Sequence, residues 1–486
     1  MDITDTNETR AARARGTLAA AIAAACMTTP LLAAEFGADV RAGITHTDNV
    51  ALATVDEESE LVYSLTPSFY LTHEASRLST NANYQLQAYR YRDIGETEVY
   101  HQYNANVRAV LVPEMFFLDV GGNRTQSIRD PEQRIPQSNL PISGNRQDRD
   151  QYYAAPSFQY AFGPSVRTQA SYRRTWIDYS DSDRIGSVGS FRSQGNEQSD
   201  GNFSIDNYAQ GQGFSWALRY DHQRTEYDEE TVPWEYQQAV AEVGYWVGGN
   251  TRLFASGGKE SAWDTPLDSS LEDTLWEAGL SQQMGERLSA EIAAGERSFG
   301  RSWRGSLDFQ FRRGSTSLSY AETPTTEGRN RFRRSALGED ELPDDFLSRP
   351  GSAQRFISNR LEWRLNLDFQ RTNLTFALFD VDRTDRTQID GTPLDDESQR
   401  GASVTASYRV GARTDLSLRG SRSEREFRDG DKSDLTRASA AVDYRLGART
   451  SLTLQYQHSK EEGESPFFSR NYDANNVSLF VTRTLF

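Results

Sequence analysis

The chain has 486 residues, a formal net charge of −17, 36% hydrophobic residues and a mean hydropathy of −0.71. This composition excludes a helical membrane bundle, because each spanning helix needs about 20 consecutive apolar residues. The acidic balance also argues against a nucleic-acid partner, since such binding needs a basic surface. Many aromatics (11%) in a polar chain are typical of a membrane β-barrel, in which only alternate strand residues face lipid.

The N-terminal segment, residues 1–34, has the features of a secretory signal peptide. Arginines precede a short apolar run, and small residues precede the expected cleavage site after Ala34. Cys26, the only cysteine, lies inside this segment, so the mature chain 35–486 would have no disulfide and no thiol chemistry. A lipoprotein cleavage before Cys26 is the alternative, although Ala23 replaces the usual leucine.

From residue 36 onward, apolar and polar residues alternate in segments of about ten residues, which predicts β-strands. An early example sets one polar face, Asn81, Asn83, Gln85 and Gln87, against one less polar face, Ala82, Tyr84, Leu86 and Ala88. The same alternation recurs in residues 303–312, 361–369, 401–410 and 436–446.

The polar alternate positions predict a water-filled lumen rather than a dry core. Arginine supplies 50 of the 53 basic residues, and it pairs well with carboxylates on a polar wall. A GC-rich genome explains the arginine excess equally well. The residues predicted to line the lumen are Arg304, Asp308, Arg312, Glu362, Arg364, Asp368, Arg409, Asp443 and Arg445.

Short turns alternate with long polar loops along the chain, as expected for an outer-membrane barrel with its turns on the periplasmic side. The turns contain glycine or proline, for example at 162–164, 248–250, 285–286, 411–412 and 447–448. The predicted loops are 47–59, 129–148, 181–196, 323–354, 384–397 and 460–471. Two hairpins, around Tyr408 and Tyr444, are near copies offset by 36 residues.

Counting strands under this pattern gives about 22, from Phe36 to the terminal Phe486. A terminal aromatic resembles the signal that the barrel assembly machinery reads. Thr482 and Thr484 share the face of Phe480 and Phe486, which departs from the usual form of that signal.

Four segments near the start of the mature chain carry a family resemblance. They are Ile44-Thr-His-Thr-Asp-Asn-Val50, Leu65-Thr-Pro-Ser-Phe69, Tyr84-Gln-Leu-Gln-Ala-Tyr-Arg-Tyr91 and Phe116-Phe-Leu-Asp-Val120. In this region, residues 36–130, the chain resembles outer-membrane barrel proteins associated with PEP-CTERM sorting and exopolysaccharide systems. The resemblance implies an outer-membrane location and a surface-polymer context, and it supplies no catalytic residues.

The residues that carry chemistry form no recognisable catalytic motif. The five histidines, His46, His73, His101, His222 and His458, show no metal-binding spacing, so we expect no metal, no cofactor and no enzyme activity. Asp221 and His222 are adjacent and would point to opposite faces of a strand. A Ser/His/Asp arrangement across strands is kept as the alternative of a barrel hydrolase.

Polar residues in the loops are expected to be structural. Thr47-Asp48-Asn49 would begin a loop, because Asp and Asn bond their own backbone. The acidic runs 56–58, 228–230, 339–341 and 461–462 would face outward as solvated surfaces. The alternative is that they bind divalent cations at the lipopolysaccharide layer.

A ring of about 22 strands encloses a wide lumen and generally holds a plug. The first strand follows the signal peptide directly, so we expect neither a plug domain nor a TonB-dependent receptor. Residues 129–148 and 323–354 are candidates for an inward-folded loop that narrows the lumen. In the second segment the constriction candidates are Arg329, Arg331, Arg333 and Arg334.

The sequence therefore predicts an all-β fold: a closed antiparallel transmembrane barrel in a Gram-negative outer membrane. The expected function is a porin-like or export conduit for polar solutes, linked to exopolysaccharide or surface-polymer systems. The alternatives are a surface anchoring barrel with an occluded lumen and, behind it, the hydrolase. Expected partners are outer-membrane lipid, lipopolysaccharide, the barrel assembly machinery and, as a further candidate, exopolysaccharide, with no nucleic acid.

Overall fold

The computed structural model describes residues 34–142, 144–180, 194–207, 213–228, 233–262, 271–326, 355–385, 388–389, 392–393, 396–427, 430–464 and 470–486. The predicted signal peptide therefore lies outside the described residues, apart from Ala34, where the first strand begins. Among the described residues, no helix is long and apolar enough to cross a membrane.

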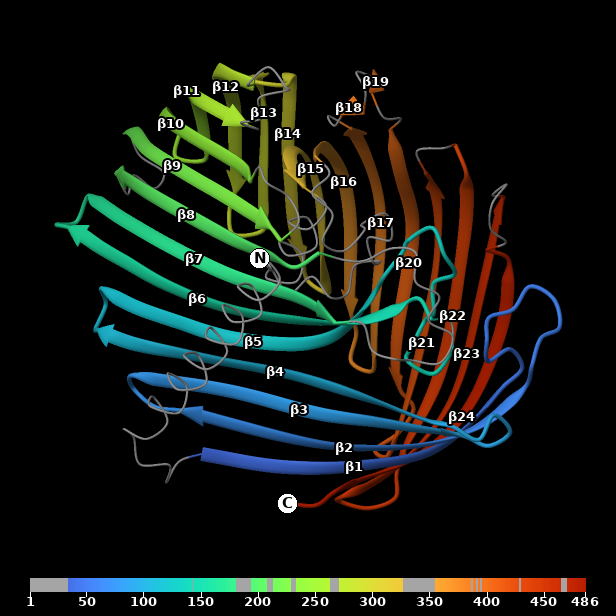
Figure 1. The fold of residues 1–486 in the computed structure, drawn as a ribbon. Coiled ribbons are helices and arrows are strands. Elements are labelled where there is room, and N and C mark those ends of the chain that lie inside the picture. Colours follow the sequence, from blue (N-terminus) through green and yellow to red (C-terminus); the bar gives the residue numbers. More distant parts are fainter. Residues whose placement is uncertain are drawn as a thin grey trace, which may run out of the picture.

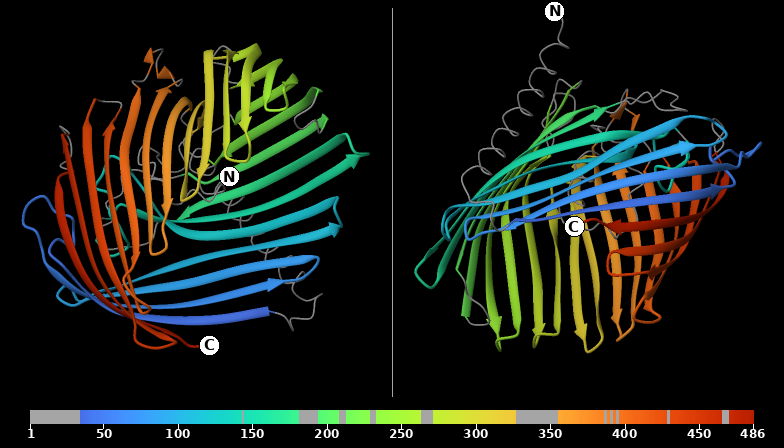
Figure 2. Two further views of the ribbon diagram at one scale, coloured as in Figure 1. Left: turned by 180° about the vertical axis from the view of Figure 1, so that it is seen from behind. Right: turned by 90° about the horizontal axis from the view of Figure 1, so that it is seen from below.

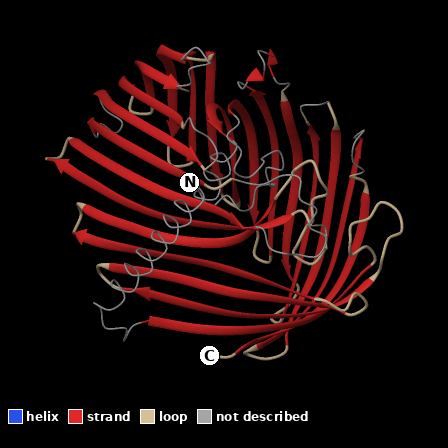
Figure 3. Ribbon diagram, in the orientation of Figure 1, coloured by secondary structure: helices blue, strands red, loops and turns tan. Residues whose placement is uncertain are grey.

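The described residues form 24 strands, shown in red in Figure 3. They are β1 (Ala34–Thr47), β2 (Glu60–Glu74), β3 (Leu78–Tyr91), β4 (Thr97–Val112), β5 (Phe116–Ile128), β6 (Arg146–Phe162), β7 (Val166–Ser180), β8 (Asn196–Asn207), β9 (Gly213–Tyr227), β10 (Trp234–Val247), β11 (Thr251–Ala262), β12 (Leu271–Met284), β13 (Leu288–Arg297), β14 (Gly300–Phe311), β15 (Gly314–Thr326), β16 (Arg355–Asp368), β17 (Thr372–Asp385), β18 (Gln388–Ile389), β19 (Thr392–Pro393), β20 (Glu397–Arg409), β21 (Thr414–Glu426), β22 (Lys432–Arg445), β23 (Thr450–Glu464) and β24 (Tyr472–Thr484).

Twenty-two of these strands form one closed antiparallel sheet, and this confirms the predicted count (Figure 1). Each strand pairs with the next along the chain, with β17 pairing directly to β20. The ring closes where β1 pairs with β24. The two short strands β18 and β19 pair only with each other, between β17 and β20. A closed ring leaves no unpaired backbone edge, which is the condition for a sheet to sit in lipid.

The strand alternation gives the ring an apolar outer face. Leu218, Ile292 and Leu378 are 49%, 57% and 48% exposed, although they are large aliphatic side chains. Tyr408 and Val442 are also exposed, so they do not converge on a shared dry interior. Exposed apolar residues at alternate positions around a closed ring are the lipid-facing band of a transmembrane barrel. We call the opposite side of each strand its lumen face.

The predicted long loops lie at one end of the ring and the predicted short turns at the other, but the loop end also has short connections, β3–β4, β13–β14 and β21–β22. Figure 2 (right) shows the tight turns along one end, and Gly163, Gly248 and Gly285 adopt positive φ angles there. The two near-copied hairpins are β20–β21 and β22–β23. Two predicted loops are shorter than expected: 129–148 ends where β6 begins, and part of 460–471 is strand, because β23 continues to Glu464.

A ring-over-glycine contact holds the seam where the barrel closes. Gly43 on β1 lies opposite Phe480 on β24, on the lumen face. A Cβ atom on Gly43 would lie 2.2 Å from the Phe480 ring. The guanidinium of Arg41 lies 3.7 Å from the centroid of the same ring, so Phe480 has little room to move. Val477, Leu479 and Val481 of β24 are exposed and form its lipid-facing side.

We expect Gly43→Ala to weaken this seam. The added methyl group overpacks against Phe480 and should lower the free energy of unfolding by about 1–3 kcal/mol. Urea titration of the detergent-solubilised barrel measures this change. Gly420→Ala is the matched control, because its Cβ would meet only Val404, at 3.6 Å. Phe480→Ala should restore space to the Gly43 variant; equal losses from the two glycine variants would contradict the packing argument.

Candidate functional site

The connection between β5 and β6, residues 129–145, folds into the ring and is here called the inner loop. Its two ends meet, since the backbone nitrogen of Arg129 donates to the carbonyl oxygen of Asn145 over 3.2 Å. The buried Asn145 side chain also bonds both backbone groups of Asp130. Figure 1 shows this teal segment within the ring, reaching from the β5–β6 end toward β20–β22.

A fully buried ion pair binds the far side of the inner loop. Arg425 on β21 and Glu461 on β23 are both 0% exposed, and their Nη2 and Oε1 atoms lie 2.5 Å apart. Arg425 also donates to the carbonyl oxygen of Pro131, and Glu461 accepts from the backbone nitrogen of Ile135, both over 3.2 Å. The ion pair is therefore part of the loop's attachment to the wall.

The start of β24 adds a second attachment on the same wall. The Tyr472 hydroxyl donates to the carbonyl oxygen of Ile135 over 2.8 Å. Arg470, immediately before the strand, donates through Nε to the carbonyl oxygen of Glu132 over 2.5 Å. Backbone carbonyls of the loop are thus satisfied by side chains of the wall, which fixes the path of the loop.

The near side of the inner loop rests on β2 and β3. The Tyr91 hydroxyl on β3 donates to the carbonyl oxygen of Leu140 over 2.7 Å. The backbone nitrogen of Ile142 donates to the carbonyl oxygen of Val50, in the connection between β1 and β2, over 2.8 Å. Val50, Val62, Tyr91 and Leu140 together form a buried apolar cluster. The loop is therefore held at both ends of its span by burial as well as by hydrogen bonds.

These contacts identify the lumen face independently of exposure. Gln87 and Tyr91 of β3, Arg425 of β21, Glu461 of β23 and Tyr472 of β24 all touch the inner loop and alternate with lipid-facing residues. The lumen face is the side from which the loop is bound. Residues of the same phase on the other strands face the same space.

Ion pairs line the lumen face of β9–β14, and we call this set the charged wall: Arg219, Glu242, Arg252, Glu260, Glu277, Glu291, Arg297 and Arg304. Glu242 pairs with Arg219, 2.8 Å away, and with Arg252. Arg297 lies 2.6 Å from Glu260. Arg304 on β14 lies 2.7 Å from Glu277 and also pairs with Glu291. Paired charges of both signs can coordinate ions and polar solutes without a strong net field.

The predicted lumen residues that lie in strands have the phase of the lumen face, but they do not form one cluster. Arg304 belongs to the charged wall, and Glu362 pairs with Arg360 one position along its face. Arg409 and Arg445 both approach Asp415, at 3.6 Å and 2.9 Å. Asp443 accepts from Thr453 over 2.5 Å.

For the other predicted lumen residues the structure gives placement only. Asp308, Arg364 and Asp368 lie on β14 and β16, and Arg312 lies in the turn between β14 and β15 rather than in a strand. The constriction candidates Arg329, Arg331, Arg333 and Arg334 lie outside the described residues. Contact of any of these side chains with a solute stays a prediction.

We expect Arg304→Gln to change ion selectivity. The substitution leaves Glu277 and Glu291 without their shared cation, so the lumen gains negative character. In a salt gradient across a planar bilayer, the cation-to-anion permeability ratio should rise about twofold. Arg400→Gln makes the same charge change on the outer face, where Arg400 pairs with Glu424, and it should leave the ratio unchanged. Similar shifts in both variants would mean that the charged wall does not face the permeation path.

The remaining polar motifs are structural. Asn49 is buried and bonds both backbone groups of Ala53, and Asp48 accepts from the backbone nitrogen of Asn475, so Thr47-Asp48-Asn49 does begin a loop. The prediction that Glu461 belongs to an outward acidic loop was wrong, because the residue lies in β23 and points into the lumen against Arg425.

The histidines are dispersed over the barrel. Asp221 and His222 point to opposite faces, as expected: Asp221 bonds Asn202 on the lumen face, while His222 lies 3.0 Å from Glu235 on the outer face. His101 bonds Tyr84, also on the outer face. Within the part of the chain that the structure describes, no group of three or more His, Cys, Asp or Glu side chains is placed to hold a metal ion.

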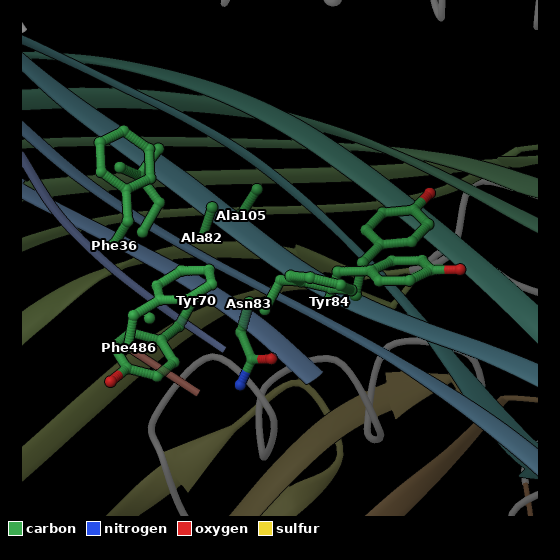
Figure 4. Close-up of a pocket in the computed structure, with 11 residues that line it drawn as sticks. Phe36, Tyr70, Ala82, Asn83, Tyr84, Ala105 and Phe486 are labelled. Atoms are coloured by element: carbon green, nitrogen blue, oxygen red, sulfur yellow. The ribbon is translucent and has the colours of Figure 1, made fainter. Parts of the chain in front are cut away.

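One apolar hollow of about 400 Å³ lies on the wall formed by β1–β4, near the C-terminus (Figure 4). Phe36, Phe69, Tyr84 and Phe486 are among its lining residues. In the close-up, the side chains of Ala82 and Ala105 lie on one side of the strands and Asn83 points to the other. The hollow has few polar groups to orient a solute, so it is a feature of the lipid-facing wall.

No protein-family model and no curated protein match this sequence. Several solved structures do share its fold. The siderophore receptor PirA from Acinetobacter baumannii is 9% identical with a TM-score of 0.50, over 93% of this chain and 80% of that one. The FrpB iron transporter from Neisseria meningitidis is 10% identical with a TM-score of 0.50, over 93% and 81%.

The ferric enterobactin receptor PfeA from Pseudomonas aeruginosa is similar to the same degree, with 10% identity, a TM-score of 0.50 and coverage of 93% and 80%. At such low identity these likenesses show the fold alone. Together with the closed 22-strand ring and its apolar outer band, they make this chain an outer-membrane β-barrel.

Proposed function

We propose that the barrel is a conduit for polar solutes whose outer mouth is narrowed by the inner loop. The observation that carries this proposal is the attachment of the loop to two separate stretches of the lumen face, through Tyr91 on β3 and through Arg425 and Glu461 on β21 and β23. A 22-strand ring is wide enough for a channel, and such rings generally hold an element that fills them. A loop fixed over part of the mouth supplies a size and charge filter.

Conductance of the purified full chain in planar lipid bilayers tests this function. The proposal expects stable ohmic current steps in simple salt, because the charged wall and the hydroxyl and amide side chains of the lumen support a water-filled path. Absence of any current steps, with the barrel verified as folded by its circular dichroism spectrum, would overturn it.

The second candidate is a surface anchoring barrel with an occluded lumen. The observation in its favour is the depth of the loop's attachment: the Arg425–Glu461 pair is fully buried, and Ile135 of the loop is 0% exposed. An element held so firmly suits a permanent seal as well as a filter. The same conductance measurement separates the two functions, since an anchor is silent.

We also propose the finer association with exopolysaccharide or another surface polymer, which is supported by the resemblance in residues 36–130. A strain that lacks the protein should then have a changed amount of polysaccharide on its surface or in its medium. An unchanged amount in both places would argue against the association.

Ion pairs on the outer face support lipid as a partner. Arg400–Glu424 and Arg422–Asp434 lie toward the loop end of the apolar band, at the level expected for lipopolysaccharide headgroups.

A further inference from the structure

The lumen face of β3–β5 carries a continuous set of amide side chains, here called the amide face. Its members are Asn81, Asn83, Gln85, Gln87, Gln102, Asn104, Asn106 and Asn123. The strand register places them side by side, with Asn81 opposite Asn106, Asn83 opposite Asn104, Gln85 opposite Gln102 and Asn104 opposite Asn123. In such a sheet, neighbouring amides lie about 5 Å apart across strands and about 7 Å apart along a strand.

Much of the hydrogen-bonding capacity of the amide face is unused. Gln87 and Gln102 bond each other over 3.2 Å at its loop end. Within the described part of the chain, the side chains of Asn83, Gln85 and Asn104 form no hydrogen bond, and those of Asn83 and Asn104 are exposed. Each primary amide offers two donors and one acceptor oxygen, so the face presents both kinds of group to whatever enters the lumen.

The amide face is also free of charge. No acidic or basic side chain lies on the lumen face of β3 between Ser79 and Tyr89, or of β4 between Tyr100 and Asn106. The adjoining lumen face of β2 continues this neutral surface with hydroxyl groups, from Ser64 through Tyr70 to Thr72. Arg108 and Asp119 lie nearer the periplasmic turns and approach each other at 4.0 Å, and Arg41 on β1 and Arg146 on β6 lie within electrostatic reach of Tyr89.

Tyrosines flank the amide face on its β2 side and at its loop end. Tyr70 is opposite Asn83 on β2 and is 42% exposed. Tyr89 and Tyr100 pack edge to face at the loop end, with ring centroids 6.0 Å apart. Aromatic rings supply flat apolar contact beside a polar group, which suits the mixed apolar and hydroxylated surface of a sugar ring.

We infer that the amide face is a binding site for uncharged, hydroxyl-rich solutes, of which neutral oligosaccharides are the probe class. This inference rests on the proposed conduit function and names its preferred cargo. Hydroxyl groups both donate and accept hydrogen bonds, as amides do. Such a solute can therefore replace the hydrogen bonds that it loses to water with hydrogen bonds to the amide face. An ionised solute gains no counter-charge on this face and finds it instead on the charged wall of β9–β14.

Current blockade by maltohexaose tests the inference with the full chain in planar bilayers. The double variant Asn83→Ala with Asn104→Ala removes two exposed amides that lie opposite each other and whose side chains form no hydrogen bond with any other residue that the structure describes. The apparent dissociation constant for blockade should rise roughly fivefold to thirtyfold. Because the solute is neutral, the wild-type constant should barely depend on salt.

Ser407→Ala with Ser417→Ala is the matched control. These serines are also opposite each other and exposed on the lumen face, on β20 and β21. Their loss should change blockade less than twofold, since a single hydroxyl contributes little to a shared surface. An equal loss in both double variants, or unchanged blockade in the amide variant, would overturn the inference.

Binding in detergent separates this inference from the conduit function. Isothermal titration of the solubilised full chain with maltohexaose should show heat that the Asn83→Ala, Asn104→Ala variant loses. A barrel that binds the sugar but never conducts would overturn the conduit and leave the amide face as a binding site. A barrel that conducts but neither binds nor is blocked would overturn the amide face alone.

Discussion

Replacing residues 131–143 by a short Gly-Ser linker is expected to raise the single-channel conductance about threefold or more, because it removes the element that narrows the mouth. A short linker suffices, since the backbones of Arg129 and Asn145 already meet at the base of the inner loop. The pairing of β5 with β6 continues up to Ile128 and Arg146, so the strands themselves remain intact. Conductance steps in planar bilayers give the measurement.

The same linker inserted between Gly447 and Ala448 serves as the control. That turn joins β22 and β23 on the periplasmic side, and Gly447 has open space around it. The insertion should leave conductance as it is in the natural chain. If excision of the inner loop also leaves conductance unchanged, the narrowest part of the path lies elsewhere, and the loop is not the filter.

Glu461→Gln is expected to release the inner loop from the wall. The substitution keeps the shape of the side chain but leaves the guanidinium of Arg425 buried without its carboxylate. Removing one partner of a fully buried pair costs about 3–5 kcal/mol, and detachment of the loop is the simplest way to hydrate the charge. Trypsin added from outside should then cut after Arg134 at least about tenfold faster, following the larger open population.

Two further variants make this result interpretable. Glu424→Gln breaks a solvent-exposed pair with Arg400 on the outer face and should not alter cleavage. Tyr472→Phe removes only the hydroxyl that bonds Ile135 and should give a smaller increase, in line with the loss of about 1 kcal/mol for one hydrogen bond. A protease-resistant Glu461 variant would show that the loop is held without the ion pair.

The strands and their faces could be predicted from the sequence because alternation is a local property. Leu361 and Glu362, for example, fall on opposite faces whatever the rest of the chain does. The two hairpins around Tyr408 and Tyr444 could also be predicted, because their sequences are near copies. Closure of the ring followed from the requirement that no sheet edge be left in lipid, and the strand count followed from the alternation of turns and loops.

The position of the inner loop in the sequence could be predicted, but the residues that it contacts could not. Its length and polarity mark residues 129–148, whereas the partner of Pro131 is Arg425, 294 residues further along the chain. The separation of Arg425 from Glu461 is 36 residues, which equals the offset of the two near-copied hairpins, but the repeat does not show that these two side chains meet. Glu461 looked like a loop carboxylate because it precedes a second glutamate and a glycine, and only the register of β23 places it inside.

The lumen residues illustrate the same limit. Arg304 was predicted from its phase on β14, but its partners Glu277 and Glu291 lie on β12 and β13. Which charges pair depends on the stagger between strands, and a single sequence does not specify that stagger. The amide face was visible as an alternation in residues 81–87, while its continuation on β4 needed the pairing of Asn83 with Asn104.

The join between the first and last strands also determines when the molecule can be completed during its biogenesis. Thr45 bonds Ser478, 433 residues later, so sealing requires the whole polypeptide to have been delivered. Until then the intermediate has two open edges. The contacts between β1 and β24, which offset the entropic cost of bringing these edges together, form only at the final step. A premature stop codon that deletes β24 would therefore leave β1 and β23 each with one unpaired edge and produce a substrate for periplasmic proteolysis rather than a slightly smaller pore.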